Sequence, residues 1–597
     1  MRGPALRGTR AAMYDAIAGS ALAREQLREV VHEPSVESAL FKLRECLSEA
    51  PESCVVKFEQ LAQNSLLEPV LYTQNQFRDW FYAQRAKHVV EMREPWSWFS
   101  QARYMRRRIL FHAGPTNSGK THSAVERLLQ ARSGVYCAPI KALASQMWTR
   151  INRQVPCDLL IGDERRYGGF ADHVSCTMEM APVDQQVDVA VIDEVQMFED
   201  KSRGWAFTRA LLGLPARELH ICGEWRAVEL VEKILKASKE HRNFSVINHK
   251  RFTPLEIDKP LNGDFSKLSS GDCLVVFSRN NVFEFKAQIE RERPDLVVNI
   301  VYGGLPFRVR EEQTAEFNDG VEKNRAHVLV ATDAIAYGLN LNIRRMIFTT
   351  VRKFNGYAHS ILEPSNILQV AGRAGRYGLK FSEKGYVTTL HEKDWPILQK
   401  TLNRPRLAPI QHAGLIPTAD TLLVFSELYP KITSFHQLLS EFNKQATTSD
   451  LFFMCDIEKS LLSLAALLED VDLTLRDRIV FCFVPMNSKE ARSRDLLKQY
   501  AISHSKGEIV EIGIETPDLE SPSPEKMADL ETDSRMLEIY SWLALRFTNT
   551  FKHYDEARLL KDKIGESIQA CLKHIRKGVS PVQKKNQSRL PKTDGNA

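Results

Sequence analysis

The feature that most constrains the fold is a series of short apolar runs separated by stretches with helical periodicity. Short, mainly apolar runs of this kind are typical of parallel strands buried on both faces of a sheet. A first group comprises Ile109–Ala113, Gly134–Ala138, Val187–Ile192 and Glu218–Cys222. After a polar joint near Gly263–Gly271, a second group comprises Cys273–Phe277, Val297–Tyr302, His327–Ala331, Arg345–Thr350 and Gly385–Leu390. The pattern predicts an α/β fold with two consecutive, doubly wound units of similar size.

Helical patterns flank these two units on both sides. Apolar residues recur three and four positions apart from about Leu22 to Arg93, and again in several segments beyond Thr421. Beyond His391 we expect no further strands, and we expect the acidic, proline-bearing segment 507–533 to be a loop. The predicted parts are a mostly helical N-terminal region, the two α/β units, a helical C-terminal domain and a disordered basic tail, at 1–94, 95–262, 263–400, 401–577 and 578–597.

Composition excludes several classes of protein. A chain of 597 residues is too long for a single core, and the longest nearly continuous apolar stretch, Leu461–Leu468, is far shorter than the ~20 residues of a membrane-spanning helix. The ten cysteines form no C-x-x-C pair and no spacing typical of zinc ligands. We therefore expect no membrane association, no disulfide scaffold and a reducing compartment.

The net charge of +6 comes from one end of the chain. From Lys573 onward there are seven basic residues and one acidic residue, Asp594, so residues 1–572 carry no net charge. A uniformly basic coat is absent, and a polyanion would have to be held in a local groove. The first fourteen residues contain three arginines and no acid, which is typical of the start of an organelle transit peptide.

The strongest motif follows the first apolar run. Residues Gly114–Thr121 read G-P-T-N-S-G-K-T, which fits the phosphate-loop pattern G-x-x-x-x-G-K-[ST] between a strand and a helix. Backbone N–H groups of such a loop bind phosphate oxygens at a helix N-terminus. The pattern predicts that Lys120 reaches the β and γ phosphates of ATP and that Thr121 ligates Mg²⁺. The whole loop is a candidate ATP-binding site: Gly114, Pro115, Thr116, Asn117, Ser118, Gly119, Lys120 and Thr121.

Two further motifs complete a candidate catalytic site. Asp193 and Glu194 end the apolar run Val187–Ile192, where an Asp can hold Mg²⁺ and the next Glu can polarise the attacking water. In the second unit, Gln369–Arg376 reads Q-V-A-G-R-A-G-R. We expect Arg373 and Arg376 to lie at a helix start and to project from one face as arginine fingers toward the phosphates.

The order of these motifs resembles that of the superfamily-two helicases. Within that group the chain is similar to the mitochondrial degradosome ATP-dependent RNA helicases of the Suv-three type. The resemblance rests on the loop filling P-T-N-S, on Asp193–Gln196, on the A-T-D-A-I-A-Y-G-L-N segment and on Gln369–Arg376. Three further segments carry it: Ser175–Met180, Gly204–Ala210 and Ala413–Thr418. It covers the chain from about Pro95 to Ile575.

The resemblance implies two RecA-like lobes that clamp ATP, with a helical domain closing an RNA channel. It implies that Gln369 is catalytic and that Asp333 and Gly338 bind ATP. The residues that it implies for RNA binding are Pro139, Lys141, Gly162 and Thr177 in the first lobe and Ser278, Arg279 and Thr332 in the second. Tyr337, Ala336 and Asp163 stand where the family usually has Met, Gly and Glu.

These observations together predict an ATP- and Mg²⁺-dependent RNA helicase. By resemblance we expect movement from 3′ to 5′ on single strands and on duplexes with a 3′ overhang, and a 3′ exoribonuclease as partner. The expected location is the mitochondrial matrix, with the nucleus as the lesser alternative, and no small-molecule substrate other than the nucleotide is expected. Two alternatives remain open: an ATP-switched RNA-binding scaffold without unwinding, and a DNA-directed translocase.

Overall fold

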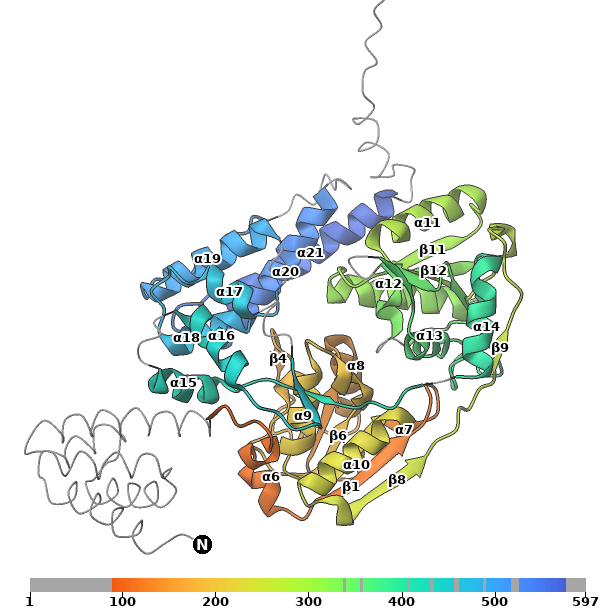
Figure 1. The fold of residues 1–597 in the computed structure, drawn as a ribbon. Coiled ribbons are helices and arrows are strands. Elements are labelled where there is room, and N and C mark those ends of the chain that lie inside the picture. The colour runs from red at the N-terminus through yellow and green to blue at the C-terminus, as the bar shows by residue number, and fades with distance from the viewer. Residues whose placement is uncertain are drawn as a thin grey trace, which may run out of the picture. The chain divides into compact units, whose positions relative to one another are not determined.

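The structure is a computed structural model, and it describes most of the chain beyond the N-terminal region. The described residues are 89–575 without 337–339, 355–357, 406, 430–433, 456–460, 487–489 and 517–525. Most of the predicted N-terminal helices, the basic tail, Tyr337 and Gly338 lie outside this set. Chain contacts divide the molecule into two compact units, 1–92 with 418–447, and 93–417 with 448–597. The second unit contains both predicted lobes (Figure 1).

The first lobe is built on a sheet of order β4-β3-β5-β2-β6-β7-β1-β8. Its strands are β1 (Arg108–Ala113), β2 (Gly134–Ala138), β3 (Cys157–Leu160), β4 (Arg165–Arg166), β5 (His173–Thr177), β6 (Val187–Ile192), β7 (Ala216–Gly223) and β8 (Phe244–Asn248). All neighbours pair in parallel except β3 and β4. The predicted buried strands are present, and their parallel pairing confirms the α/β class of the prediction.

Helices cover this sheet and connect its strands. They are α6 (Ser100–Tyr104), α7 (Lys120–Leu129), α8 (Lys141–Asn152), α9 (Gly204–Gly213) and α10 (Val228–Ala237). Helix α7 packs on β6 and β7, and α8 packs on β3 and β5. Because each of α7 and α8 begins just after a strand ends, the connecting loops lie at the carboxyl edge of the sheet.

The second lobe has its own parallel sheet of order β11-β12-β10-β13-β16-β9. Its strands are β9 (Leu255–Ile257), β10 (Asp272–Val276), β11 (Val297–Val301), β12 (His327–Thr332), β13 (Arg345–Phe348) and β16 (Gly385–Thr389). Its helices are α11 (Arg279–Glu292), α12 (Phe307–Glu322), α13 (Pro364–Ala371) and α14 (Trp395–Asn403), and a hairpin of β14 (Arg352–Phe354) and β15 (His359–Ile361) stands apart. Strand β9 pairs with β16, so this sheet begins before the expected start of the lobe at residue 263.

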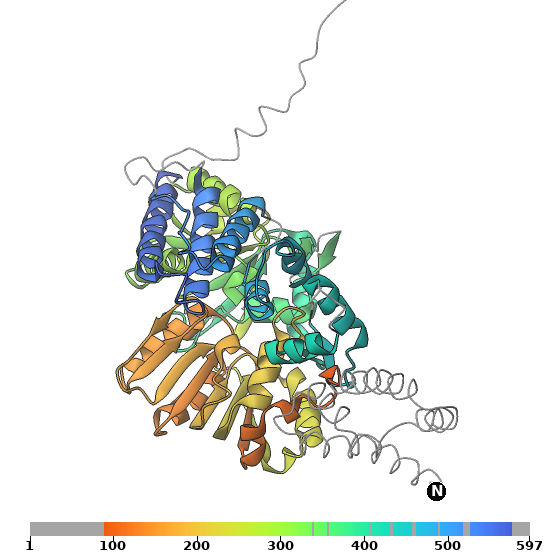
Figure 2. The ribbon, with the colours of Figure 1, turned by 90° about the vertical axis from the view of Figure 1, so that its left-hand side faces the viewer.

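The C-terminal part of the second unit is mainly helical, and Figure 2 shows its longest helices running beside one another. The helices are α17 (Leu461–Leu467), α18 (Leu475–Cys482), α19 (Ala491–Ser505), α20 (Met527–Ala544) and α21 (Tyr554–Ile575). Helix α20 packs along α21, and α21 also packs on α12 of the second lobe.

Two expectations for this region are wrong. Strands continue past His391, because β17 (Ala413–Leu415) pairs in parallel with β18 (Phe452–Met454). These strands are only three residues long, so the sequence contains no long apolar run that would predict them. One of their residues is the glycine at position 414, which lies close to the backbone of Trp205. Helix α20 begins at Met527, within the segment 507–533 that we expected to be a loop. Its first turns bury the polar residues Glu531, Thr532 and Ser534. The apolar periodicity by which a helix is predicted is therefore missing from this segment.

The described residues of the first unit form a small, separate group. Helices α15 (Ala419–Leu428) and α16 (Phe435–Gln445) pack through Phe425 and Phe442, whose ring centroids are 5.1 Å apart. The backbone N–H of Met92 donates to Thr447 O at 2.8 Å. Across both units, the eight cysteines among the described residues are buried and free. No helix in the described part of the chain is long and apolar enough to cross a membrane.

A buried ion pair holds two central strands of the second lobe together. Asp272, at the start of β10, has no exposed surface, and its carboxylate accepts from Arg345 Nη2 at 2.6 Å and from Arg344 Nη2 at 2.8 Å. Arg345 itself is almost fully buried on β13. Removing one partner of such a pair leaves a buried charge without compensation, which costs more than the pair itself contributes.

We predict that Asp272→Ala lowers the free energy of unfolding by about 3–5 kcal/mol. The matched change Asp295→Ala breaks a surface pair with Arg293 and should cost far less than the loss of Asp272. Urea unfolding followed by tryptophan fluorescence measures both. Equal losses for the two variants would contradict the structural role of Asp272.

Candidate functional site

The phosphate-loop sequence lies between β1 and α7, as predicted. Gly119 has a φ of +80° directly before α7, and Asn117 has a φ of +63°, so the loop turns sharply into the helix. A Cβ at Gly114 would lie 2.4 Å from the carbonyl oxygen of His249, so only glycine fits there. Lys120 Nζ donates to the carbonyl oxygens of Gly114 and Pro115 at 2.9 and 2.6 Å, which places its ammonium inside the loop.

Thr121 and Asp193 meet at the start of α7. The Thr121 hydroxyl is 3.1 Å from both carboxylate oxygens of Asp193, and the hydroxyl of the buried Tyr136 donates to Asp193 Oδ2 at 2.7 Å. Burial and the neighbouring charge of Glu194 raise the pKa of Asp193 to about 6, although the hydrogen bond from Tyr136 acts in the opposite direction. Asp193 is therefore a carboxylate that a nearby cation would stabilise in its charged form.

Glu194 has a left-handed backbone conformation with a φ of +56° just after β6. The side-chain amide of Gln196 donates to the Glu194 carboxylate, while Gln196 Oε1 accepts from the backbone N–H of Glu224 at 3.3 Å. This arrangement fixes the orientation of the Glu194 side chain beside Asp193. A carboxylate held in this way can orient a water molecule for attack.

The donor set fits a magnesium-bound nucleotide. Mg²⁺ is usually held by one or two protein oxygens together with phosphate oxygens, and here the Thr121 hydroxyl and the Asp193 carboxylate converge on one point. The loop backbone and Lys120 supply positive charge next to that point. The residues present therefore suit ATP with Mg²⁺.

Residues of the second lobe come directly against the phosphate loop. The Asn117 side chain donates from Nδ2 to Gly375 O at 2.9 Å and accepts at Oδ1 from the backbone N–H of Tyr377 at 3.0 Å. Arg251, in the segment between the lobes, donates to Thr116 O and Gly372 O, both at 3.0 Å. The glycine-rich segment of the second lobe and the phosphate loop thus share one hydrogen-bonded contact.

The arginine pair lies at this contact, but not at a helix start. Helix α13 ends at Ala371, so Arg373 and Arg376 follow it in an irregular turn, where Gly375 has a φ of +62°. The expected helix start is therefore wrong, because two glycines within four residues end the helix rather than begin one. The preceding Gln369 is buried on α13.

The two arginines have different surroundings. The buried Arg373 donates from Nε to Ala336 O at 2.9 Å, which ties the turn to the segment after β12. Burial and the charge of Arg373 lower the pKa of Arg376 to about 10, while the charges of Asp193 and Glu194 act to raise it. The charge of Arg376 is thus coupled to the two carboxylates of the first lobe.

The predicted RNA-binding residues of the first lobe follow the carboxyl ends of three adjacent strands. Pro139 follows β2, Gly162 lies just after β3 and Thr177 ends β5, and these strands are neighbours in the order β3-β5-β2. Lys141 begins α8, and its Nζ lies 2.7 Å from Asp163 Oδ1 and 2.9 Å from Glu538 Oε2 of α20. The structure therefore gathers these residues on one half of the carboxyl edge, and the phosphate loop on the other.

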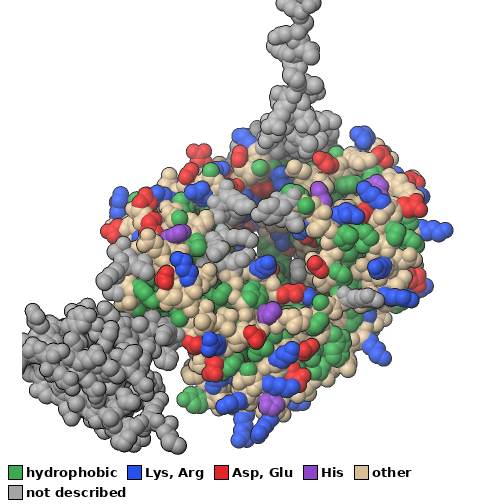
Figure 3. All heavy atoms as spheres, in the orientation of Figure 1, with side chains coloured by type: hydrophobic (Ala, Val, Ile, Leu, Met, Phe, Trp, Pro, Cys, Tyr) green, Lys and Arg blue, Asp and Glu red, His purple; other side chains and the backbone are tan. Residues whose placement is uncertain are grey.

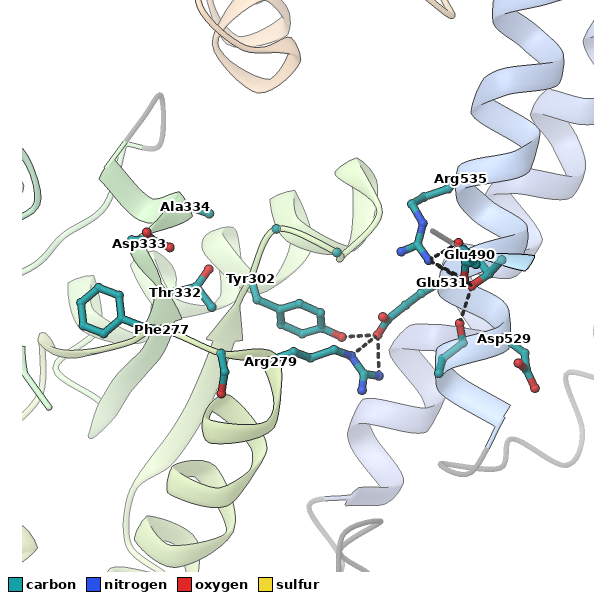
Figure 4. A pocket seen from close by; sticks show the side chains of 15 residues that line it. Phe277, Arg279, Tyr302, Thr332, Asp333, Ala334, Glu490, Asp529, Glu531 and Arg535 are labelled. Atoms are coloured by element: carbon teal, nitrogen blue, oxygen red, sulfur yellow. Dashed lines mark hydrogen bonds and ion pairs between the residues drawn. The ribbon is translucent and has the colours of Figure 1, made fainter. Parts of the chain in front are cut away.

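The predicted RNA-binding residues of the second lobe line a cavity of about 690 Å³ against α20 (Figure 4). Arg279 and Thr332 lie on one wall with Asp333, and Glu531 faces them from α20. Ser278 also lines the cavity. Asp333 is paired with Lys353 and lines this cavity, whereas we expected it to bind ATP. The expected contribution of Gly338 falls outside the described residues.

Arg279 is held from the helical domain. Its Nη2 donates to Glu531 Oε1 at 2.8 Å, its guanidinium lies 5.1 Å from the ring centroid of Phe283, and the buried Tyr302 hydroxyl donates to the same Glu531 (Figure 4). Glu531 is almost fully buried. The aromatic Tyr302 is thus a buried side chain.

Several residues of the site escaped the sequence analysis. Tyr136, Arg251, Glu531 and Glu538 have no motif of their own, and each acts through a contact with a distant segment. Asn117 was expected to bind ATP, but its contact with the second lobe was not. Only Tyr136 carried a usable signal, as a polar group in the apolar strand β2, which β6 and β7 separate from β1 and the phosphate loop.

Two tandem parallel-sheet lobes with a phosphate loop on one and an arginine pair on the other define the class of two-lobed helicases. Family profiles match in chain order. "DEXQ-box helicase domain of Suv3" matches 95–247, "Helicase conserved C-terminal domain" 258–378, "Suv3 C-terminal domain 1" 463–505, and "ATP-dependent RNA helicase SUV3 C-terminal domain" 527–574. The chain belongs to the Suv3 family of helicases.

Curated relatives agree with this membership. The rice "ATP-dependent RNA helicase SUV3, mitochondrial" is 40% identical over 78% of this chain and 79% of its own. The Arabidopsis thaliana "DExH-box ATP-dependent RNA helicase DExH16, mitochondrial" is 41% identical over 76% and 79%. The Mus musculus "ATP-dependent RNA helicase SUPV3L1, mitochondrial" is 40% identical over 82% of this chain, which spans 64% of that protein, less than two thirds of its length.

A solved structure of Saccharomyces cerevisiae Dbp5, bound to RNA and ADP with beryllium fluoride, covers 54% of this chain and 89% of its own. At a TM-score of 0.38 and 16% identity, this similarity is too low to support a further comparison.

Tyr136→Phe tests the environment of Asp193. Loss of the hydroxyl removes a hydrogen bond that favours the charged carboxylate, so the pKa of Asp193 should rise further, by up to about one unit. Only the charged form of Asp193 can hold a cation, so binding of magnesium and nucleotide is lost as the pH falls. In the variant this loss should begin at a higher pH than in the wild type. A binding titration with a fluorescent ATP analogue between about pH 5 and pH 8 measures this shift.

Tyr386→Phe, on β16 of the second lobe, is the control and should leave that pH dependence unchanged. If the two variants behaved alike, the bond between Tyr136 and Asp193 would have no part in cation binding.

Proposed function

We propose that this chain is an ATP-dependent RNA helicase that couples ATP hydrolysis to translocation on RNA and to strand separation. One observation carries the proposal. The phosphate loop and the carboxylates Asp193 and Glu194 of one lobe lie against the arginine turn of the other, joined by the hydrogen bonds of Asn117. A nucleotide in that loop would touch both lobes, so its hydrolysis can change their contact.

The roles of the ATP-site residues follow from their positions. Lys120 and the loop backbone would bind the phosphates, Thr121 and Asp193 would hold Mg²⁺, and Glu194 would orient water. Magnesium would supply positive charge that stabilises the transferred phosphoryl group. Gln369, Arg373 and Arg376 would contribute from the second lobe. The charge of Arg376 is coupled to the carboxylates, and Arg373 would position the segment after β12.

The RNA path would follow the carboxyl edges of the two sheets. The candidate contacts in the first lobe lie on adjacent strands, and those in the second lobe end β12 and follow β10, which are also adjacent. Main-chain and hydroxyl groups in such loops grip a backbone without reading bases. In the space-filling view, basic and acidic side chains are intermingled over the visible face, so the surface shown has no broad basic coat (Figure 3). An internal path agrees with this distribution.

The finer assignments come from family resemblance. We propose movement from 3′ to 5′, delivery of unwound RNA to a 3′ exoribonuclease, and action in the mitochondrial matrix. The location is supported by the printed names of the rice, Arabidopsis and mouse relatives. We further propose that residues 95–262 and 263–400 make up most of the two lobes, with β9 added to the second. The part of 401–577 that belongs to the second unit is proposed as the domain that closes the RNA channel.

Strand displacement distinguishes the candidate functions. Matched RNA and DNA duplexes with a 3′ or a 5′ overhang are incubated with the full chain, with and without ATP. Displacement of RNA from the 3′ overhang only, and only with ATP, supports the proposal. RNA binding under ATP control without displacement would instead identify a switched scaffold, and displacement of DNA alone would identify a DNA translocase.

Arg376→Ala should slow ATP hydrolysis by roughly 10³-fold, the scale typical of arginine fingers, and leave nucleotide binding nearly unchanged. The reason is that Arg376 belongs to the second lobe, whereas the phosphate loop belongs to the first. Steady-state phosphate release and a separate nucleotide-binding titration measure the two effects. A loss of binding as large as the loss of turnover would show that Arg376 holds the nucleotide instead of assisting its hydrolysis.

Glu531→Gln tests the RNA side. If Arg279 binds an RNA phosphate, it must first leave Glu531, so removing the Glu531 charge should tighten RNA binding by about 3–10-fold, since freeing a partly buried cation is worth about 1 kcal/mol. Asp529→Asn on the same helix and cavity removes the same charge without touching that ion pair and should have a smaller effect.

Fluorescence anisotropy with a short labelled RNA strand, at several salt concentrations, measures both variants. Weaker RNA binding in Glu531→Gln would mean that Glu531 positions Arg279 for RNA, and the proposed exchange would be wrong.

A further inference from the structure

Three histidines form a continuous chain beneath the phosphate loop. His112 Nε2 lies 2.8 Å from His220 Nδ1, and His112 Nδ1 lies 3.0 Å from His249 Nε2. At one end, His220 Nε2 lies 2.8 Å from Glu218 Oε1. At the other end, His249 Nδ1 lies 3.2 Å from the carbonyl oxygen of Ser118, inside the phosphate loop. Four polar contacts therefore connect a carboxylate on β7 to the loop that would bind phosphates.

The three neutral histidines carry fewer protons than their four contacts need. Each of the four contacts needs one proton to be a hydrogen bond, and neither an ionised carboxylate nor a carbonyl oxygen supplies one. Three neutral imidazoles carry only three protons, one each. The chain can be fully hydrogen-bonded only when it holds one more proton than its neutral histidines provide.

With neutral histidines, the contact that lacks a proton is the one between His249 and the phosphate loop. The Glu218 carboxylate, which also accepts from Arg127 Nε at 2.9 Å, favours a proton on His220 Nε2. With that proton on Nε2, His220 Nδ1 is an acceptor and His112 Nε2 must carry the proton that it accepts. In the same way, His112 Nδ1 is an acceptor and His249 Nε2 must carry the next proton. The lone pair of His249 Nδ1 is then left facing the lone pairs of Ser118 O, two acceptors that repel each other.

The charges around the chain oppose an extra proton when no nucleotide is present. Burial and the neighbouring histidines lower the pKa of His112 to about 4, and burial also lowers the pKa values of His220 and His249. The facing cations are Lys120 in the phosphate loop, Arg127 on α7 and Arg108 on β1, and the facing anion is Glu218. The phosphates of a nucleotide would add several negative charges beside Lys120 and so reverse this balance.

We propose that the histidine chain His112–His220–His249 positions the phosphate loop, and that nucleotide binding takes up one proton from solvent into this chain. The added proton resides on His249 Nδ1 and converts its contact with Ser118 O from a repulsion into a charged hydrogen bond. The loop is thereby held in its phosphate-binding shape most firmly when phosphate is present. This inference rests on the proposed ATP binding and adds a proton to its stoichiometry.

Two simpler explanations account for less. No group of three or more metal-binding side chains among the described residues has the geometry to hold a metal ion. The three histidines are therefore not a metal site. Plain core packing explains the burial of His112 and His220 but not the alignment of every ring nitrogen with a partner. His173 shows the ordinary case, a buried histidine whose Nε2 lies 3.1 Å from one carbonyl, that of Leu128.

Calorimetry of a non-hydrolysable ATP analogue with Mg²⁺ tests the proposal on the full chain. Titrations in two buffers with different ionisation heats give the number of protons taken up per nucleotide. We expect an uptake that approaches one as the pH falls from about 8 toward 6.5, and an affinity that falls by up to ~10-fold per pH unit as the pH rises across this window.

Substitutions at His249 separate the donor from the proton. In His249→Asn an amide N–H can donate to Ser118 O without titrating, so affinity should be kept at high pH and the uptake should be lost. His249→Leu has no donor, so affinity should be low at every pH, again without uptake. His173→Gln is the matched control in the same lobe and should behave like the wild type, and thermal melting checks that each variant folds.

The outcomes are distinct. Uptake in the wild type that disappears in both His249 variants supports the proposal. No uptake in the wild type, or wild-type uptake in His249→Asn, overturns it even if the nucleotide binds well. A wild-type protein that does not bind the nucleotide at all would overturn the proposed function itself.

Discussion

The parallel direction of the strands is the constraint on which the rest of the structure depends. Because all strands of the first lobe except β4 run the same way, the loops that leave their carboxyl ends meet along one edge. The order of the strands then assigns each loop its neighbours. Strands β3, β5 and β2 bring the candidate RNA contacts together, and β6, β7 and β1 do the same for the carboxylates and the phosphate loop. The two kinds of site therefore adjoin each other through β2 and β6.

Charge in these sites is balanced within the protein. Lys141, Arg279 and the buried Arg345 each lie against a carboxylate, and two of those carboxylates belong to the same helix, α20. Cations that already have partners do not attract a polyanion at long range, which agrees with a chain that is neutral over residues 1–572. Selectivity for a bound strand would then come from exchange of partners at short range.

Much of the architecture could be predicted from the sequence, and the reasons for the failures are physical. The family resemblance and the two-lobed α/β class are confirmed, since apolar runs of five or six residues leave few alternatives to buried strands. Strand β5, His173–Thr177, was missed because it is fully buried yet mostly polar, with Ser175 donating to Ala144 O at 2.7 Å instead of showing an apolar pattern. The segment 527–533 was assigned to a loop for the same reason. Contacts such as those of Asn117 and Glu531 join segments more than two hundred residues apart, and no local pattern encodes them. The roles of the individual site residues remain predictions.

Helix α20 has a mechanical consequence. Glu531 holds Arg279 of the second lobe and Glu538 holds Lys141 of the first, and these positions are seven residues apart on one face, about 10 Å along the axis. The two turns of α20 between these residues neither stretch nor shorten appreciably, so they keep the two ion pairs at a fixed spacing. Because this spacing is fixed, the helix cannot follow both lobes if the distance between them changes. If the spacing of the lobes changed, one ion pair would have to break while the other held, and a gradual movement would become a discrete step.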